Sequence, residues 1–153
     1  MDRNSPVREI MTTDVLTFGP EDEVEQAMRT LLDRNIDAAP VVDADGIVLG
    51  VLSNGDLIVQ ESEVHFPTLL TFLGGTLELG HKHFEEELRR ALGSKVSDVM
   101  STHPIVCSDD DTIERAATIM HEKEVSRLPV VRDGHLVGLV SRNDVLRAIL
   151  DSG

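Results

Sequence analysis

Two short stretches of the chain place a serine and an aspartate at the same spacing. Gly50 to Asp56 reads GVLSNGD, and Gly138 to Asp144 reads GLVSRND. An ionised carboxylate can accept hydrogen bonds from both hydroxyls of a vicinal diol. A serine followed three residues later by an acid is also close to a capping box, which begins a helix. The motif therefore indicates either a ligand held twice or a helix begun twice.

The motif belongs to a longer internal repeat. Val7 begins the stretch VREIM, and 89 positions later Val96 begins VSDVM. The same shift carries Pro40-Val41-Val42 onto Pro129-Val130-Val131. One residue is then dropped in a turn, and a shift of 88 aligns Gly46/Gly134, Gly50/Gly138, Ser53/Ser141 and Asp56/Asp144. Self-similarity of this kind indicates two copies of one structural unit.

Each copy predicts the same order of elements. A short helix opens it, with Ser5 or Ser94 as N-cap and Pro6 at the first helical position. A brief extended run follows. A longer helix then begins at Gly19-Pro20 or at Ser108, with three acidic residues in its first turn, where the helix dipole favours them.

The remaining elements of each copy are a buried helix face, a hairpin and a last helix. Two Val-rich strands flank an Asp-Gly turn, and the last helix follows Ser53 or Ser141. Helical spacing places these residues on the buried faces: Val24, Ala27, Met28, Leu31 and Leu32 in copy one, and Ile113, Ala116, Ala117 and Met120 in copy two.

This order predicts an α+β fold. Two pseudo-symmetric β-α-β-β-α half-domains, each too small to cover its own sheet, are expected to pack sheet to sheet into one domain. We expect repeat 1 over residues 1–60, an insert over 61–93 and repeat 2 over 94–153.

Composition restricts the partners. The 153 residues include 28 acidic and 14 basic side chains, a net charge of −14, and only 3% are aromatic. Nucleic acid is not expected as the main partner, because its backbone is bound by clustered Lys and Arg and its bases by aromatic platforms. A small anionic ligand stays possible, because local donors decide its binding.

The expected location is the cytoplasm. Cys107 is the only cysteine, so no internal disulfide can form. The N-terminal stretch lacks the apolar region of a secretory signal. The longest apolar-looking stretch, HFPTLLTFLGGTLELG, is too short and interrupted to span a bilayer, so no membrane association is expected.

The combined motifs resemble the CBS domain, named after cystathionine β-synthase, which normally occurs as a tandem pair. They cover residues 7–60 and 96–150: VREIM and VSDVM, the hairpins APVVDADG and LPVVRDG, and both copies of Gly-x-x-Ser-x-x-Asp. The resemblance implies a non-enzymatic regulatory module that requires no cofactor. Its implied ligand is an adenosine compound (AMP, ADP, ATP or S-adenosylmethionine), bound in the cleft between the two repeats. It also implies a homodimer that signals by conformational shift to a protein partner.

The resemblance also implies two sets of nucleotide-binding residues. In the family the motif aspartate accepts hydrogen bonds from the ribose hydroxyls, and the motif serine lies beside the ribose or phosphate. Backbone groups near the first strand and before the hairpin proline hold the adenine. Carried over, the second-repeat set is Thr102, His103, Ile105, Arg127, Leu128, Pro129, Ser141, Arg142 and Asp144. The first-repeat set is Thr13, Val15, Ala38, Ala39, Ser53 and Asp56.

The two sets are not equivalent. Arg127 in copy two stands where copy one has Ala38, and His103 stands where copy one has Asp14. Arg and His pair with a phosphate, whereas an aspartate repels it. The Asp144 site is therefore predicted to be the better nucleotide site of the two. The alternative is that Arg127 and Arg142 are solvated surface residues.

Two other functions stay open at this point. In one, the pair binds no ligand and serves as a dimerisation scaffold. In the other, the insert holds a metal for hydrolysis through His81, His83, Glu85 and Glu86, although His at i and i+2 diverge on a helix. The apolar residues of the insert favour a dimer interface or a role as a ligand gate. Cys107, in the second repeat, is expected to be a small buried residue.

Overall fold

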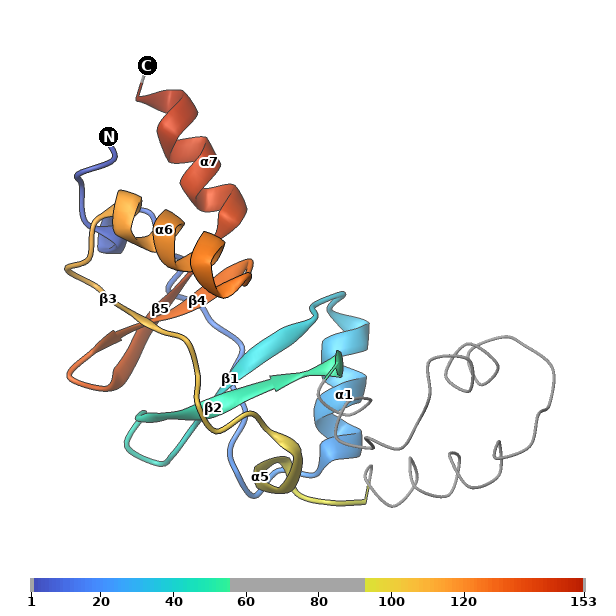
Figure 1. Ribbon diagram of the computed structural model, residues 1–153. Helices are drawn as coiled ribbons and strands as arrows, with labels where there is room; N and C mark the ends of the chain where they lie inside the picture. Colours follow the sequence, from blue (N-terminus) through green and yellow to red (C-terminus); the bar gives the residue numbers. More distant parts are fainter. Residues whose placement is uncertain (1, 56–92, 153) are drawn as a thin grey trace, which may run out of the picture. The chain divides into compact units, whose positions relative to one another are not determined.

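The structure is a computed structural model that describes residues 2–55 and 93–152, and Figure 1 shows the order of its elements. The first copy contains the 3-10 helix η1 (Val7–Glu9), α1 (Val24–Asp33), β1 (Ala38–Val42) and β2 (Val48–Ser53). The second contains α5 (Val96–Val99), β3 (Cys107–Ser108), α6 (Ile113–Lys123), β4 (Arg127–Arg132), β5 (His135–Ser141) and α7 (Arg142–Asp151). The mixture of helices and strands confirms the predicted α+β class.

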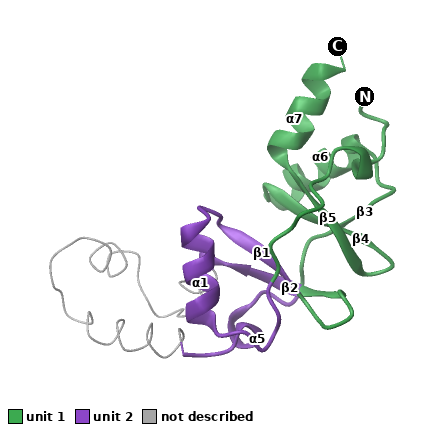
Figure 2. Cartoon of the chain, turned by 180° about the vertical axis from the view of Figure 1, so that it is seen from behind, with its two compact units in different colours: residues 1–17, 42–49, 103–153 green, residues 18–41, 50–102 purple. Residues whose placement is uncertain are grey.

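The chain divides into two compact units, drawn in different colours in Figure 2. Unit 1 contains residues 1–17, 42–49 and 103–153, and unit 2 contains residues 18–41 and 50–102. Each unit therefore combines segments from both copies of the repeat.

The sheet of unit 1 has the order β3-β4-β5. β3 runs parallel to β4, and β4 pairs antiparallel with β5 from Arg127 opposite Ser141 to Arg132 opposite His135. The turn between β4 and β5 has positive φ at Asp133 (53°) and Gly134 (83°), the backbone of a type I′ hairpin. The Asp-Gly signal in the sequence predicted this hairpin, and the structure confirms it.

The core of unit 1 contains a residue from the other copy. We call residues 2–13 and 94–102, which lead into copies one and two, the leading segments. Val7 of the first leading segment is fully buried among Ile113, Leu128 and other residues of copy two. Thr12 then forms a bridge with Leu139, with N–H to carbonyl distances of 2.8 and 2.9 Å in the two directions. The segment before copy one thus completes the fold of copy two.

Unit 2 shows the reciprocal exchange. Val96 and Val99 of α5, in the second leading segment, are buried in this unit. Ser101 forms a bridge with Val51 of β2, with hydrogen bonds of 2.9 and 3.1 Å. Phe18 pairs in parallel with Val41, in the place that β3 takes in unit 1. The sequence repeat predicted the opening helices but not that each one packs on the other copy.

The long helices begin later than predicted. α1 begins at Val24 and α6 at Ile113, so the acidic triplets lie in a turn before each helix and not in its first turn. The carboxylate of Asp22 accepts the Gly19 N–H at 2.8 Å, and that of Asp111 accepts the Ser108 N–H at 2.8 Å. These side-chain bonds close a turn that delays the helix.

Three smaller predictions were also wrong. Leu32 is 71% exposed, because it lies at the edge of the apolar stripe of α1. Pro6 is the N-cap of η1 and not its first residue. Lys95, not Ser94, is the N-cap of α5, where its backbone N–H donates to the Asp98 carboxylate at 3.1 Å.

Candidate functional site

The serine and aspartate of the second motif form a complete capping box at the start of α7. The Ser141 hydroxyl accepts the Asp144 N–H at 3.1 Å, and the Asp144 carboxylate accepts the Ser141 N–H at 2.9 Å. The other carboxylate oxygen lies 3.6 Å from a guanidinium nitrogen of Arg147. The Asp144 side chain is 18% exposed, so it stays accessible to a ligand. Capping and ligand binding are therefore compatible.

Arg127 lies at the same end of the β4–β5 hairpin. It is directly opposite Ser141 in the antiparallel register, so the two side chains share one face of the sheet. Arg142 begins α7, is exposed, and donates its backbone N–H to the Ser126 carbonyl at 2.8 Å. The structure thus brings two arginines, the serine and the aspartate of the predicted set together within unit 1.

The other residues of the second-repeat set differ in exposure. Leu128 and Pro129 of β4 are buried, and Ile105 packs against the core of unit 1. Leu128 and Ile105 therefore contribute their side chains to the core of unit 1. His103 in unit 1 and Thr102 in unit 2 are exposed.

The first-repeat set is divided between the units. Thr13 and Val15 belong to unit 1, whereas Ala38, Ala39 and Ser53 belong to unit 2. Residues 54 and 55 begin a helix after Ser53, as predicted, and Asp56 lies outside the described residues.

Both motif glycines have a structural task that the sequence did not reveal. A methyl group added at Gly50 would overlap the carbonyl oxygen of Ser101. One added at Gly138 would overlap the sulfur of Met11 and lie 3.0 Å from the Thr12 carbonyl oxygen. Each glycine therefore permits a leading segment to cross the last strand of a hairpin. The signal for this contact was the recurrence of Met11-Thr12-Thr13 as Met100-Ser101-Thr102.

An ion pair between the buried Asp109 and the exposed Arg132 supports the same unit. Asp109, only 3% exposed, accepts hydrogen bonds from Nε of Arg132 at 2.8 Å and from a terminal nitrogen at 2.5 Å. The pair ties the turn before α6 to the end of β4. The hydrogen bonds that Arg132 donates to the Asp109 carboxylate raise the pKa of its guanidinium, so its charge is retained.

Cys107 is buried, as predicted, and is a poor nucleophile. Burial, with a smaller contribution from the negative charge of Asp111, raises the pKa of its thiol to about 12. At neutral pH the group is a neutral thiol, and the thiolate is the reactive form.

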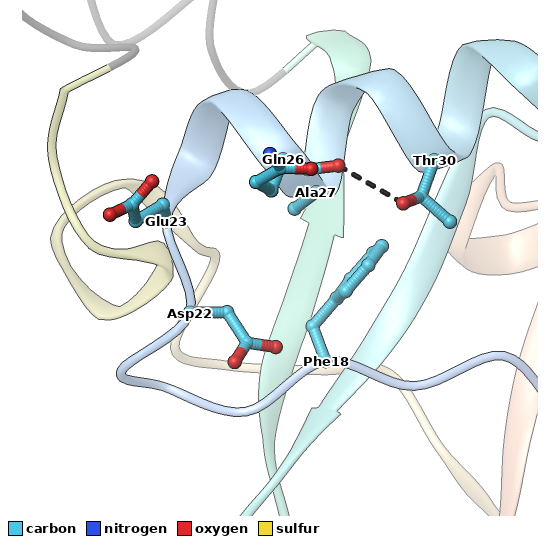
Figure 3. A pocket seen from close by; sticks show the side chains of 6 residues that line it. All are labelled: Phe18, Asp22, Glu23, Gln26, Ala27 and Thr30. Carbon is cyan, nitrogen blue, oxygen red and sulfur yellow. Dashed lines mark hydrogen bonds between the residues drawn. The ribbon is translucent and has the colours of Figure 1, made fainter.

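A hollow of about 260 Å³ lies beside α1 in unit 2 (Figure 3). The Phe18 ring lies below the helix, and the carboxylates of Asp22 and Glu23 lie toward one end. Two carboxylates repel a phosphate, so the hollow does not suit a nucleotide. Its lining contains none of the predicted site residues: Phe18, Asp22, Glu23, Gln26, Ala27 and Thr30.

The residues of the metal hypothesis lie outside the described part of the chain. Residues 2–55 and 93–152 contain no group of three or more His, Cys, Asp or Glu placed to hold a metal ion. His81, His83, Glu85 and Glu86 lie outside these ranges, as does the rest of the insert's apolar stretch. None of the described helices has the length and apolar character needed to cross a membrane.

Comparisons with known proteins identify the family. A sequence model of the CBS domain matches residues 7–62 and 96–151. The chain belongs to the CBS domain family and carries the domain twice. Protein MJ1426 of Methanocaldococcus jannaschii is 33% identical, over 94% of this chain and 90% of that protein. The chloroplastic CBS domain-containing protein CBSX1 of Arabidopsis thaliana is 32% identical, over 94% of this chain and 64% of its own length.

The fold matches a solved structure of another member. The crystal structure of CBSX2 in complex with AMP has a TM-score of 0.73 and 27% sequence identity. The alignment covers 97% of this chain and 98% of that chain. The fold of a CBS pair is therefore shown over almost the whole chain.

Proposed function

We propose that the chain is a regulatory module that binds an adenosine-containing ligand through the second-repeat set. AMP, ADP, ATP and S-adenosylmethionine are the candidates. Asp144 would accept the ribose hydroxyls, and Arg127 and Arg142 would pair with a phosphate. No catalytic residue is assigned. Binding would favour one arrangement of the two repeats, which a partner protein reads.

One observation carries the proposal. Arg127, Ser141 and Asp144 converge at one end of the β4–β5 hairpin, and a related CBS pair was crystallised with AMP. A carboxylate supplies acceptors for a diol and the arginines supply donors for an anion. The first set lacks an arginine at the equivalent position, Ala38, which favours the Asp144 site.

Thermal melting tests the proposal. The protein is melted with AMP, ADP, ATP, S-adenosylmethionine and, as a non-adenine control, GMP. Ligand at a hundred times its dissociation constant stabilises the folded state by about 2.7 kcal/mol, which raises the melting temperature by roughly 5–10 °C. A shift with one adenine compound and none with GMP identifies the ligand.

A matched pair of variants separates ligand binding from helix capping. Ser141→Ala and Asp144→Ala both break the capping box, but only Asp144→Ala removes the carboxylate proposed to bind ribose. The shift should therefore shrink in Asp144→Ala and persist in large part in Ser141→Ala. Equal shifts in both variants would contradict the role of Asp144.

The complete capping box also favours a second candidate function, a ligand-free interaction scaffold. The box accounts for the serine and aspartate of the motif without any ligand. In that case none of the adenine compounds moves the melting temperature.

We propose a homodimer under either function, because α7 exposes Leu146, Ile149 and Leu150 at helical spacing. Sedimentation of wild type and Leu150→Glu tests this: the variant should dissociate at concentrations at which wild type is dimeric.

A further inference from the structure

Each leading segment places a methionine sulfur against a motif glycine. In unit 1, a methyl group added at Gly138 of β5 would overlap the sulfur of Met11. In unit 2, a methyl group added at Gly50 of β2 would lie 3.1 Å from the sulfur of Met100. The two thioethers therefore fill space beside the glycines, in which the side chain of any other residue would stand.

These two methionines are also the more accessible ones in residues 2–55 and 93–152. Met11 and Met100 are partly exposed, whereas Met28 of α1 and Met120 of α6 are only 7% and 4% exposed. An oxidant has to contact the sulfur atom before it can react, so a peroxide in solution reaches the first pair more readily than the second.

Oxidation changes the chemistry of the contact with the glycine. The sulfur lone pair attacks one oxygen of a hydroperoxide, an S–O bond forms and the O–O bond breaks. With hydrogen peroxide, a proton moves to the departing oxygen, which leaves as water, and the sulfur gives up two electrons to the peroxide. The product is a polar, chiral sulfoxide. Its oxygen needs water or a hydrogen-bond donor, so the side chain has to leave the apolar contact with the glycine.

We propose that Met11 and Met100 are sites of reversible oxidation, and that each sulfoxide releases its leading segment from the hairpin on which it packs. Methionine sulfoxide reductases restore the thioether, so the released state can be reversed. The inference depends on no ligand. It adds to the proposed function a response of the fold to oxidants, acting separately within each unit.

The bridges beside these methionines report the release. Thr12 and Leu139 exchange hydrogen bonds of 2.8 and 2.9 Å in unit 1, and Ser101 and Val51 exchange bonds of 2.9 and 3.1 Å in unit 2. Each is an isolated bridge and not part of a longer ladder. Movement of the segment should therefore expose these amides to solvent.

Peptide mass spectrometry after limited treatment with hydrogen peroxide tests the two sites. In the folded protein Met11 and Met100 should be converted several-fold faster than Met28 and Met120, and in urea all four should react at similar rates. Similar rates for all four methionines in the folded protein overturn the inference.

Hydrogen exchange of the oxidised protein tests the release. In wild type the amides of both bridges should exchange about tenfold faster after oxidation, the equivalent of losing one hydrogen bond. Treatment with a methionine sulfoxide reductase and a dithiol should restore the slow exchange. Conversion of both methionines without faster exchange at the bridges overturns the inference. This comparison needs no substitution, so it decides the question even where a variant does not fold.

Leucine variants assign each effect to its sulfur. Leucine keeps the size of the side chain but cannot be oxidised. In oxidised Met11→Leu only the bridge of unit 2 should exchange faster, and in oxidised Met100→Leu only that of unit 1. Oxidation should lower the melting temperature of wild type by roughly 2–10 °C and that of the double variant by much less. Met120→Leu is the control and should respond as wild type does; an equal fall in the double variant contradicts the assignment.

Discussion

Ser141 and Asp144 satisfy each other's backbone N–H groups at the start of α7, at 3.1 and 2.9 Å. The motif that predicted a ligand is thus also the residue pair that begins the last helix. The carboxylate oxygen of Asp144 that does not accept the Ser141 N–H lies 3.6 Å from a guanidinium nitrogen of the exposed Arg147. Loss of stability in a variant of Asp144 is therefore expected with or without a ligand.

The first prediction concerns this cap. Ser141→Ala should destabilise the protein by about 1 kcal/mol, because the Asp144 N–H loses its side-chain acceptor. The melting temperature should fall by roughly 2–4 °C. Ser152→Ala is the control at the other end of α7, where the exposed hydroxyl donates to the Ile149 carbonyl, and it should melt close to wild type. Equal melting of wild type and Ser141→Ala would contradict the cap.

The second prediction concerns the exchanged leading segments. Val7→Ala should destabilise unit 1 by about 2 kcal/mol, because a fully buried side chain loses two methyl groups and leaves a cavity. Hydrogen exchange should quicken in β4 and β5 of copy two. Val96→Ala, the same position in the repeat, should instead quicken exchange in α1. Faster exchange confined to the substituted residue's own copy would show that the segments are not exchanged.

The sequence repeat was sufficient to predict the elements and the pairs of core positions. Phe18 and Cys107 are both buried, as are Leu31 and Met120, each pair 89 positions apart. Hydrophobic spacing and the Asp-Gly turns carry this information locally, within one copy. The hairpins were therefore predicted correctly, including the tight turn at Asp133-Gly134.

The exchange of the leading segments could not be predicted in the same way. Val7 and Val96 occupy equivalent positions, so either could pack on either copy without any change in the pattern of apolar residues. The choice depends on long-range contacts, at Gly138 for one segment and at Gly50 for the other. The late starts of α1 and α6 were not predicted for another reason. Asp22 and Asp111 accept hydrogen bonds from the backbone of a turn that precedes each helix. A cluster of acidic residues is equally typical of such a turn and of the first turn of a helix.

The third prediction concerns the ion pair between the buried Asp109 and the exposed Arg132. Arg132→Ala should lower the melting temperature by several degrees and by more than Asp109→Ala, because it leaves a buried carboxylate without its partner. The double variant should be more stable than Arg132→Ala alone. Arg8→Ala is the control, since its ion pair with Asp110 is exposed and exposed pairs contribute little. A double variant less stable than Arg132→Ala would contradict this account.

The fourth prediction concerns the pH dependence of stability. Burial raises the pKa of the Cys107 thiol from 9.0 to about 12 in the folded state. Above pH 9 the unfolded chain loses this proton while the folded chain keeps it, so the unfolded state binds fewer protons. The stability of the protein should therefore fall as the pH rises from 9 toward 12, by about 1.4 kcal/mol per pH unit from this group.

The variant Cys107→Ala isolates that contribution. Urea unfolding of wild type and variant is measured at several values between pH 8 and pH 10.5, and the difference between their free energies of unfolding is plotted. Other titrating groups cancel in the difference, which should be constant below pH 9 and then shift in favour of the variant. A difference that stays constant over the whole pH range would mean that the thiol has the same pKa in the folded and unfolded states. The Cys107 side chain would then be more accessible than its exposed fraction of 2% indicates.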